Sequence, residues 1–413
     1  MNYYEADIIR TKQRIKKIRE NPDPARLKSN TTNYEHRLNS RRKDLEHWRQ
    51  GKPFADYHGM GECLLDSMGF RHSRIGGLSH SMMEPQKYLE EARAMGLPVE
   101  NACDSAYIGT GMIKCGDLPE EAIGICTPHG CTPKMLQRTF ISHHLYEGKV
   151  FSYCFDLPFE QNEASIEYLV NQYREFIDLV EKKFPGIKYD EDKLIECQAE
   201  EKAESYNFEV FQMLKHKPSP IAGYDCWQGW GGAGYSRAQR DEIAERIEKG
   251  IAAVPGEKLR ILWAVTRPLF FDPFKVLTKR KAAVIFRYTG NATDLAPVPQ
   301  PVYYGGRKLT PLEIEAADVL TRQYGVNGAK WVSDMMWVCK ELEIDAIIYY
   351  NQRGCTPTLG LRRMVEETAE KELGIPTLQL EGKKWDSSYA DEATITAQLD
   401  EFAQMCLSRK GLA

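Results

Sequence analysis

The tetrapeptide Gly-Cys-Thr-Pro occurs twice in this chain, and it is the sequence feature that most limits the possible folds. The two copies are residues 130–133 and 354–357. Each copy follows an apolar run of strand character, residues 122–126 in the first case and 345–351 in the second. Each also precedes a helical pattern, where Thr is a favourable N-cap and Pro fits the first helical turn. The repeat therefore predicts two strand–turn–helix junctions with a cysteine in each turn.

The rest of the chain continues this alternation of strands and helices. Further strand candidates are residues 151–157, 260–265, 282–286 and 376–380. This order is typical of parallel sheets covered by helices, so we expect an α/β protein with two flavodoxin-like or Rossmann-like parallel-sheet domains. The expected division is a helical N-terminal segment (1–50), a first α/β domain (51–160), a helical region (161–255) and a second α/β domain (256–413).

Composition and charge narrow the possible function classes. The formal net charge is −4, with 28% charged and 42% hydrophobic residues. This balance argues against a nucleic-acid or membrane-surface role carried by bulk charge. No apolar run reaches the roughly 18 residues of a membrane span, and the charged N-terminus has no apolar core of the signal-peptide kind. We therefore expect a cytoplasmic protein.

Eleven cysteines are many for such a chain. Their odd number, without a signal peptide, argues against a disulfide framework. Cys131 and Cys355 are expected just before helix N-termini, which favour a thiolate or an anionic cluster. Gly130 and Gly354 would let the backbone turn and a bulky group approach. The alternative is that both cysteines are small buried side chains at ordinary junctions.

A metal site needs at least one more ligand, and the sequence offers two candidates. Cys103 follows a loop and precedes a helical or mixed segment, whereas Cys126 ends its own strand candidate. Zinc sites usually show close CxxC-like pairs, and this chain has no CxxC. Single cysteines from separate elements suit an iron–sulfur cluster wedged between domains better.

Two other motifs carry little weight. Residues 229–234 match GxGxxG, but loop-like residues precede them where a dinucleotide fingerprint needs a strand. The chain has no GxxxxGK[ST] motif, so it should not hydrolyse ATP through a P-loop. His129, two residues before Cys131, is a candidate catalytic residue, although a lone loop histidine is more often structural.

The ordered set Cys103, Gly130-Cys131 and Gly354-Cys355 resembles the 2-hydroxyacyl-CoA dehydratase and benzoyl-CoA reductase superfamily. The resemblance is to its cluster-bearing D-component type of subunit. Residues 345–402 strengthen it, with a strand, a Cys turn, a helix and Gly-Ile-Pro before a last strand, as do residues 217–221. The likeness covers roughly residues 50–410.

This resemblance implies a [4Fe-4S] cluster held by Cys103, Cys131 and Cys355, with a fourth iron site open to water or to a substrate oxygen. It implies an acyl-CoA substrate, a homologous second subunit or homodimer partner, and a separate ATP-hydrolysing iron–sulfur activator. In the dehydratases one injected electron makes a ketyl radical anion that expels the hydroxyl group. In the reductases the same low-potential chemistry reduces an aromatic ring.

The chain departs from the family pattern near residue 60. Family members often carry Pro-x-Glu there, whereas this chain has Glu62 without such a proline, and Glu62 is a second candidate catalytic residue. One alternative is a double-cubane [8Fe-9S] cluster that uses further cysteines, and another is a non-catalytic iron–sulfur electron-transfer partner. The candidate extra ligands of the double-cubane cluster are Cys115, Cys126, Cys154 and Cys226. We expect no cluster ligand among Cys63, Cys197 and Cys406.

Overall fold

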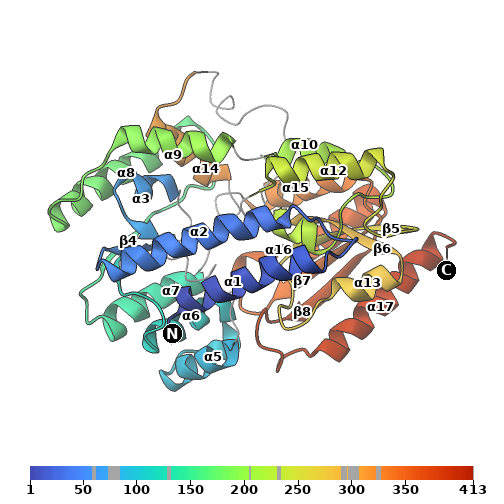
Figure 1. Ribbon diagram of the computed structural model, residues 1–413, viewed down its shortest axis with the longest axis horizontal. Coiled ribbons are helices and arrows are strands. Elements are labelled where there is room, and N and C mark those ends of the chain that lie inside the picture. The colour runs from blue at the N-terminus through green and yellow to red at the C-terminus, as the bar shows by residue number, and fades with distance from the viewer. Residues whose placement is uncertain are drawn as a thin grey trace. The chain divides into compact units, whose positions relative to one another are not determined.

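The computed structural model describes residues 1–57, 62–72, 84–127, 132–203, 206–229, 234–289, 295, 307–321 and 327–412. These residues form two compact units, each built around one four-stranded sheet (Figure 1). The first unit takes its described residues from the ranges 1–7, 40–203 and 296–327. The second takes its described residues from 8–39, 204–295 and 328–413.

Both sheets are parallel and have the same strand order. In the first unit the order is β2-β1-β3-β4, with β1 (Phe54–Asp56), β2 (Arg71–His72), β3 (Glu121–Cys126) and β4 (Phe151–Cys154). In the second it is β6-β5-β7-β8, with β5 (Leu259–Val265), β6 (Ala282–Tyr288), β7 (Ala346–Gln352) and β8 (Thr377–Gly382). The strand order reverses between β1 and β3 and between β5 and β7. Ligands of open α/β sheets bind beyond the carboxyl ends of the strands at such a switch point.

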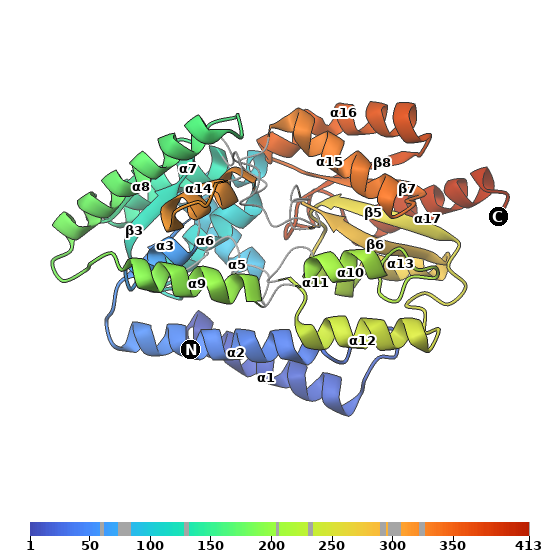
Figure 2. The same ribbon diagram turned by 90° about the horizontal axis from the view of Figure 1, so that it is seen from above.

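The second sheet is buried on both faces, which is why its strands are almost continuously apolar. Every residue of β5 and of β7 is buried. On one face the strands pack against α13 and α17, and on the other against α15 and α16 (Figure 2). The helices of this unit are α10 (Asn207–Met213), α11 (Tyr224–Gly229), α12 (Arg237–Glu248), α13 (Phe274–Lys279), α15 (Gly328–Glu341), α16 (Thr356–Leu373) and α17 (Glu392–Arg409).

The core of the first unit lies between its sheet and a layer of helices that includes α8. The apolar face of α8 repeats at helical spacing and is buried, and Asn162 caps this helix by accepting from the Ser165 N–H at 2.9 Å. The helices of this unit are α3 (Glu62–Ser67), α5 (Pro85–Ala94), α6 (Asp104–Lys114), α7 (Thr132–Phe140), α8 (Glu163–Lys183), α9 (Glu191–Ala203) and α14 (Pro311–Thr321). Two short turns follow α5 and α7, namely η2 (Val99–Asn101) and η3 (Ile141–Leu145).

Two N-terminal helices precede the first sheet, α1 (Tyr3–Glu20) and α2 (Asn30–Arg49). Within the first unit, buried Asp44 of α2 accepts hydrogen bonds from Arg41 at 2.8 Å and from Arg71 at 2.6 Å. Because Arg71 lies in β2, this carboxylate connects the N-terminal helices to the edge of the first sheet.

The structure confirms the predicted α/β fold with two parallel-sheet domains. The residues predicted as strands in the second sheet lie in β5, β6, β7 and β8. The prediction missed β1 and β2, and it interpreted residues 217–234 as a loop, although α11 lies within them. The first sheet's last strand is also shorter than the apolar run that predicted it, because β4 ends at Cys154.

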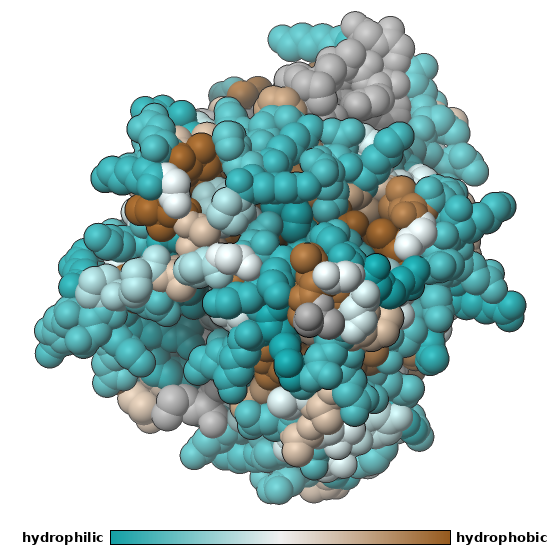
Figure 3. All heavy atoms as spheres, turned by 90° about the vertical axis from the view of Figure 1, so that its right-hand side faces the viewer, coloured by the Kyte–Doolittle hydropathy of each residue, from teal (hydrophilic) through white to brown (hydrophobic). Residues whose placement is uncertain are grey.

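Among the described residues, no helix is both long and apolar enough to cross a membrane. The face drawn in Figure 3 is mostly hydrophilic, and its coloured hydrophobic residues form small separate patches. Single exposed apolar residues of this kind are ordinary on soluble surfaces.

Candidate functional site

Cys355 lies in a tight turn between β7 and α16. Its N–H donates to the carbonyl of Gln352 at 2.9 Å, and Gly354 in between has φ +82°. Only glycine adopts this left-handed conformation at little cost, which explains the glycine before the cysteine. Cys355 is the N-cap residue of α16 and is partly exposed. The structure therefore places this thiol at the amino end of a long helix, beyond the carboxyl edge of the second sheet.

Contacts to both neighbouring strands fix this turn. The Tyr349 hydroxyl donates to the Thr358 carbonyl at 2.6 Å and joins β7 to the first turn of α16. The Arg353 N–H donates to the Gly382 carbonyl at 2.9 Å and joins the turn to β8. Burial raises the pKa of the Cys355 thiol, while the hydroxyl and N–H of Thr358 partly offset this effect. A bound metal centre would supply the positive charge that a thiolate needs here.

The first Gly-Cys-Thr-Pro copy belongs to the equivalent junction of the other unit. β3 is the third strand of its sheet, as β7 is of the other, and α7 begins at Thr132. His129, Gly130 and Cys131 themselves lie outside the described residues. The expected proximity of the Cys131 and Cys355 sulfurs therefore stays a prediction.

A buried ion triad fixes α7 on the first sheet. Arg138 of α7 donates to Asp56 of β1 and to Glu121 of β3, and all three side chains are buried. The two carboxylates raise the pKa of the Arg138 guanidinium against the opposing effect of burial, which is the largest. A Cβ at Gly124 would overlap the Arg138 side chain, so a glycine in β3 is required for this crossing. The triad holds the helix that begins directly after Cys131 at a fixed place over β1 and β3.

Cys103 is the N-cap residue of α6, in the same unit as α7. It is partly exposed, and the following helix is almost entirely buried. Gln137 of α7 donates to the Ala106 carbonyl in the first turn of α6 and to the Thr110 hydroxyl at 3.0 Å. These bonds join α7 to α6, the helix that Cys103 caps.

The donor set and its surroundings suit a sulfur-ligated cluster. Cys103 and Cys355 are both N-cap residues, where the helix dipole favours a negatively charged thiolate or cluster. Thr127 and Asn351 lie four residues before the two repeated cysteines, and both are fully buried. The Thr127 hydroxyl and the Asn351 Oδ1 have no hydrogen-bond partner among the described residues. Buried polar atoms are normally paired, so these two equivalent positions are available to a bound group.

Glu62 begins α3, the helix that follows β1. His72 at the end of β2 lies near it, with 3.7 Å between His72 Nε2 and Glu62 Oε2 and 3.5 Å to Asp66 Oδ1. The Tyr57 ring packs edge-on against His72 at 5.3 Å. These groups follow the carboxyl ends of β1 and β2, at the edge where the Cys131 turn follows β3. The sequence analysis missed His72, because a two-residue strand leaves no periodic signal.

Comparison with known protein families agrees with this arrangement. Residues 63–406 match the family model described as 2-hydroxyglutaryl-CoA dehydratase, D-component. The chain belongs to this family. The match begins within α3 and ends within α17, so it includes the three cysteines proposed as ligands.

Two curated relatives are similar to this member of the D-component family. The alpha subunit of (R)-2-hydroxyglutaryl-CoA dehydratase from Acidaminococcus fermentans is 23% identical over 56% of this chain and 50% of its own. The alpha subunit of lactoyl-CoA dehydratase from Anaerotignum propionicum is 23% identical over 60% of this chain and 61% of its own. The matched regions thus span between half and two thirds of each relative.

The D-component chain also contains a disulfide that the cysteine count argued against. Cys63 of α3 and Cys197 of α9 are bonded, with Cα atoms 5.5 Å apart. Both helices pack against the same face of the first sheet, and composition cannot reveal that contact. Because Cys63 and Cys197 are bonded to each other, neither has a free thiol that could bind a cluster.

Several other cysteines are buried within single elements. Cys126 ends β3 and is buried, with its Sγ 3.9 Å from the Tyr153 carbonyl, and it lies opposite exposed Cys154 in the sheet register. Cys226 of α11 is fully buried, and burial raises the pKa of its thiol. Cys406 packs in the core of the second unit.

Cys115 is the C-cap residue of α6, whereas Cys103 is the N-cap residue of the same helix. At 1.5 Å per residue the two positions are roughly 18 Å apart along the helix axis. They therefore lie too far apart to bind the same cluster. The described positions thus favour the three-cysteine set over the larger set of the double-cubane alternative.

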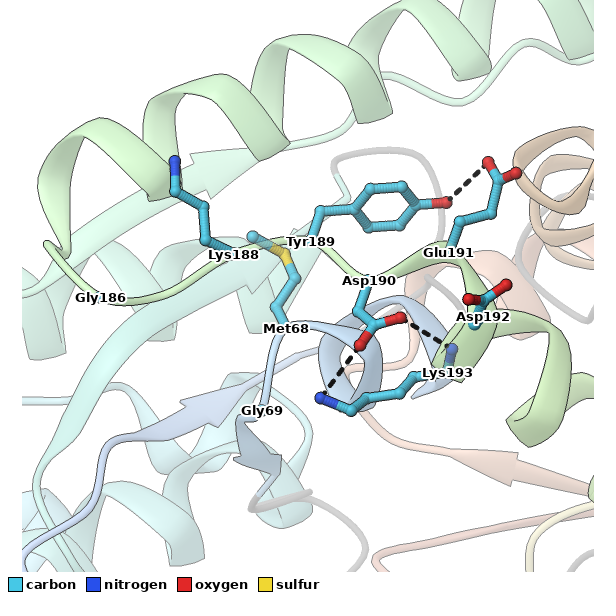
Figure 4. Close-up of a pocket in the computed structure, with 9 residues that line it drawn as sticks. All are labelled: Met68, Gly69, Gly186, Lys188, Tyr189, Asp190, Glu191, Asp192 and Lys193. Carbon is cyan, nitrogen blue, oxygen red and sulfur yellow. Dashed lines mark hydrogen bonds and ion pairs between the residues drawn. The ribbon is translucent and has the colours of Figure 1, made fainter.

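Two surface hollows lie away from these cysteines. One, of about 560 Å³, is lined by the end of α3 and by residues 186–193 (Figure 4). Figure 4 shows polar side chains around it that contact each other: Lys193 pairs with Asp190, and the Tyr189 hydroxyl donates to Glu191. The other is lined by the second half of α16 and the start of β8. Neither lies at the carboxyl edge of its sheet, where the candidate ligands are.

Proposed function

We propose that this chain is the [4Fe-4S] subunit of a 2-hydroxyacyl-CoA dehydratase. Such an enzyme removes the hydroxyl group from C2 and a proton from C3 of the acyl group, and it yields a 2-enoyl-CoA and water. The observation that carries the proposal is the equivalent placement of the two Gly-Cys-Thr-Pro copies after the third strand of two sheets with identical strand order. The match to the 2-hydroxyglutaryl-CoA dehydratase D-component family is the reason for assigning these cysteines to a dehydratase.

Cys103, Cys131 and Cys355 would hold the cluster. The amino ends of α6 and α16 favour the negative charge of their thiolates, because each helix carries roughly half a positive charge there. When bound, the cluster supplies a Lewis-acidic iron and a single low-potential electron. The chain's own contribution is to fix the thiols, through the Arg138 triad in one unit and the Tyr349–Thr358 bond in the other.

Proton transfer requires a group that accepts the C3 proton and one that donates to the departing hydroxyl. Glu62 and His72 are the described residues best placed for this role in the first unit. The two groups lie 3.7 Å apart, beyond the roughly 2.6–3.2 Å of direct proton transfer, so a water or a substrate oxygen would have to bridge them. His129 is a further candidate from the sequence and lies outside the described residues.

The proposed enzyme needs partners. Both curated relatives are named as alpha subunits, which supports a second subunit for this chain. The sequence has no P-loop, which supports a separate ATP-hydrolysing activator that delivers the electron. We propose dehydration rather than reduction of an aromatic ring, because the relatives are dehydratases.

An assay under strictly anaerobic conditions tests this proposal. The purified chain is combined with its second subunit, the activator and ATP, and 2-hydroxyglutaryl-CoA and lactoyl-CoA are offered separately. Enoyl-CoA formation, followed by mass spectrometry, is expected only when activator and ATP are both present. Cys339 is buried in α15, so Cys339→Ser is the control that should keep activity. Turnover by this chain alone would contradict the proposal, as would equal product in the absence of activator.

A further inference from the structure

Each strand of the second sheet has a basic residue at or just after its carboxyl end, and carboxylates lie there too, with Glu381 3.9 Å from Arg353 and Asp386 buried after β8. Arg267 lies two residues after the end of β5, Arg287 is the penultimate residue of β6, and Arg353 directly follows β7. β8 is followed by Lys383 and Lys384, both buried. All four strands therefore deliver a cation to the edge where ligands of such sheets bind.

Among the described residues, the strands of the first sheet end at or near Asp56, His72, Cys126 and Asp156, and none of these is a lysine or an arginine. The cations at the carboxyl edge of the second sheet favour an anionic part of a ligand there.

Arg267 is the most buried arginine among these cations. Its side chain is 7% exposed, and its guanidinium lies over the rings of Tyr224 at 5.4 Å, Trp227 at 5.3 Å and Phe274 at 5.5 Å. One terminal nitrogen donates to the Pro268 carbonyl at 2.9 Å. Its Nε is buried and has no hydrogen-bond partner among the described residues. A buried guanidinium donor without an acceptor is costly unless a ligand supplies one.

Two more guanidinium groups surround the same tyrosine. Arg26 lies over the Tyr224 ring at 4.5 Å, and Arg14 interacts with the Tyr224 hydroxyl. Burial raises the pKa of Tyr224, but the combined effect of Arg14, Arg267 and Arg26 lowers it below its usual value. The local potential around Tyr224 is therefore positive.

Nearby carboxylates are already engaged in other contacts. Asp225 accepts from Arg26 at 2.7 Å, from the Leu27 N–H at 2.9 Å and from Asn30 at 2.8 Å. Asp272 accepts from the Phe274 N–H at 3.1 Å and interacts with Arg267 through its charge. Neither carboxylate accepts from the Nε–H of Arg267, so this buried donor has no acceptor among the described residues.

The backbone that leads into Arg267 is strained. Val265, the last residue of β5, has φ +73°, a conformation that β-branched residues rarely adopt. The Trp263 indole N–H holds the next carbonyl, that of Thr266, at 2.6 Å. Strain of this kind persists where the surrounding structure enforces it and concentrates at ligand sites. Here it accompanies the burial of an arginine against three aromatic rings.

We propose that Arg267, with Arg287 and the cations beside it, binds a phosphate group of coenzyme A at the carboxyl edge of the second sheet. The inference rests on the proposed acyl-CoA function and adds to it the unit and the residues that recognise the nucleotide end of the substrate. Guanidinium groups pair with phosphate through charge-assisted hydrogen bonds, which are about twice as strong as neutral ones.

Calorimetric titration of the anaerobically purified full chain tests this inference. The probes are coenzyme A, 3′-dephospho-coenzyme A and pantetheine, which lacks every phosphate. The wild-type chain should bind coenzyme A at least about tenfold more tightly than pantetheine. Arg267→Gln should remove most of that difference and leave pantetheine binding unchanged, while Arg267→Lys should restore part of it. A smaller affinity for 3′-dephospho-coenzyme A would assign the site to the 3′-phosphate, and an equal affinity would assign it to the diphosphate.

Two further variants keep the test decisive. If Arg267→Gln fails to fold, Arg287→Gln removes a neighbouring, less buried cation and should weaken coenzyme A binding in the same phosphate-dependent way. The matched control is Arg363→Gln on the exposed surface of α16, where Arg363 pairs with Glu367. Equal affinity of the wild type for coenzyme A and pantetheine would overturn the inference. So would folded variants of Arg267 and Arg287 that bind coenzyme A normally.

The dehydratase assay separates this inference from the proposed function. Phosphate-dependent binding of coenzyme A without dehydration would overturn the function and support the site. Dehydration by a chain whose folded Arg267→Gln and Arg287→Gln variants bind coenzyme A normally would overturn the site alone.

Discussion

At the residue scale, the positive φ of Gly354 permits the tight turn that places Cys355 at the N-cap position of α16. The context of Gly354 and Cys355 predicted a turn before a helix, and the structure shows the positive φ of this glycine and the N-cap position of this cysteine. Local chemistry determines both features, so one sequence suffices to predict them. His72 was not predicted as a candidate, because it lies near Glu62 and Asp66 only in the folded chain.

We predict that Glu62→Gln lowers kcat by about 10²- to 10⁴-fold, the usual contribution of a positioned proton-transfer group. The amide cannot accept a proton, so KM and the visible cluster absorbance should change little. Glu167→Gln is the control, because this exposed carboxylate lies on α8, a different helix from α3 and α9. Steady-state kinetics of both variants, with iron content measured in parallel, provide the check. Wild-type kcat in Glu62→Gln would exclude Glu62 from proton transfer.

At the element scale, long buried strands were predictable and short ones were not. β5 and β7 have seven residues each and are wholly buried, so their mostly apolar sequences identified them. β1 and β2 have three and two residues and show no recognisable alternation. α11 lies in a segment rich in glycine and proline, and tertiary contacts overrode that local signal. The strand order depends on crossover connections, and local pattern does not contain that information.

The ion triad of α7 yields a stability prediction. Arg138→Met should reduce the free energy of unfolding by about 3–5 kcal/mol, because it leaves the buried carboxylates of Asp56 and Glu121 without their cation. Chemical denaturation followed by circular dichroism measures the change. Arg174→Met is the matched control, since Arg174 is exposed on α8 and should contribute little. Equal losses in the two variants would show that the triad has no special structural role.

The disulfide between α3 and α9 yields a second element-scale prediction. It closes a segment of 134 residues, and restriction of the unfolded chain by such a loop is worth about 4–5 kcal/mol in the chain-entropy account. Reductant should therefore lower the Tm of the isolated, oxidised chain, and Cys197→Ser should abolish the effect of reductant. Cys339→Ser should leave that effect intact. Peptide mapping without reductant should recover residues 63 and 197 in one linked species, and two separately alkylated thiols would contradict the bond.

At the scale of the whole molecule, the two units repeat one strand order around two copies of the same tetrapeptide. Family membership extends over residues 63–406 and includes both copies. The sequence predicted two parallel sheets, but it did not predict that described residues from 8–39 belong to the second unit with β5–β8. The N-terminal residues belong to the second unit through contacts such as the one between Arg26 and Asp225, which are 199 residues apart in the sequence. We propose that Cys103, Cys131 and Cys355 hold one iron–sulfur cluster.

Iron and sulfide analysis of the anaerobically purified chain and its cysteine variants tests that claim most directly. The account predicts about four irons and four sulfides per wild-type chain. Cys103→Ser, Cys131→Ser and Cys355→Ser should each lose the cluster absorbance, because two thiolates cannot hold the cluster against solvent. Cys406→Ser should keep it, since Cys406 packs in the hydrophobic core. A full complement of iron in any of the first three variants, or about eight irons in the wild type, would contradict the account.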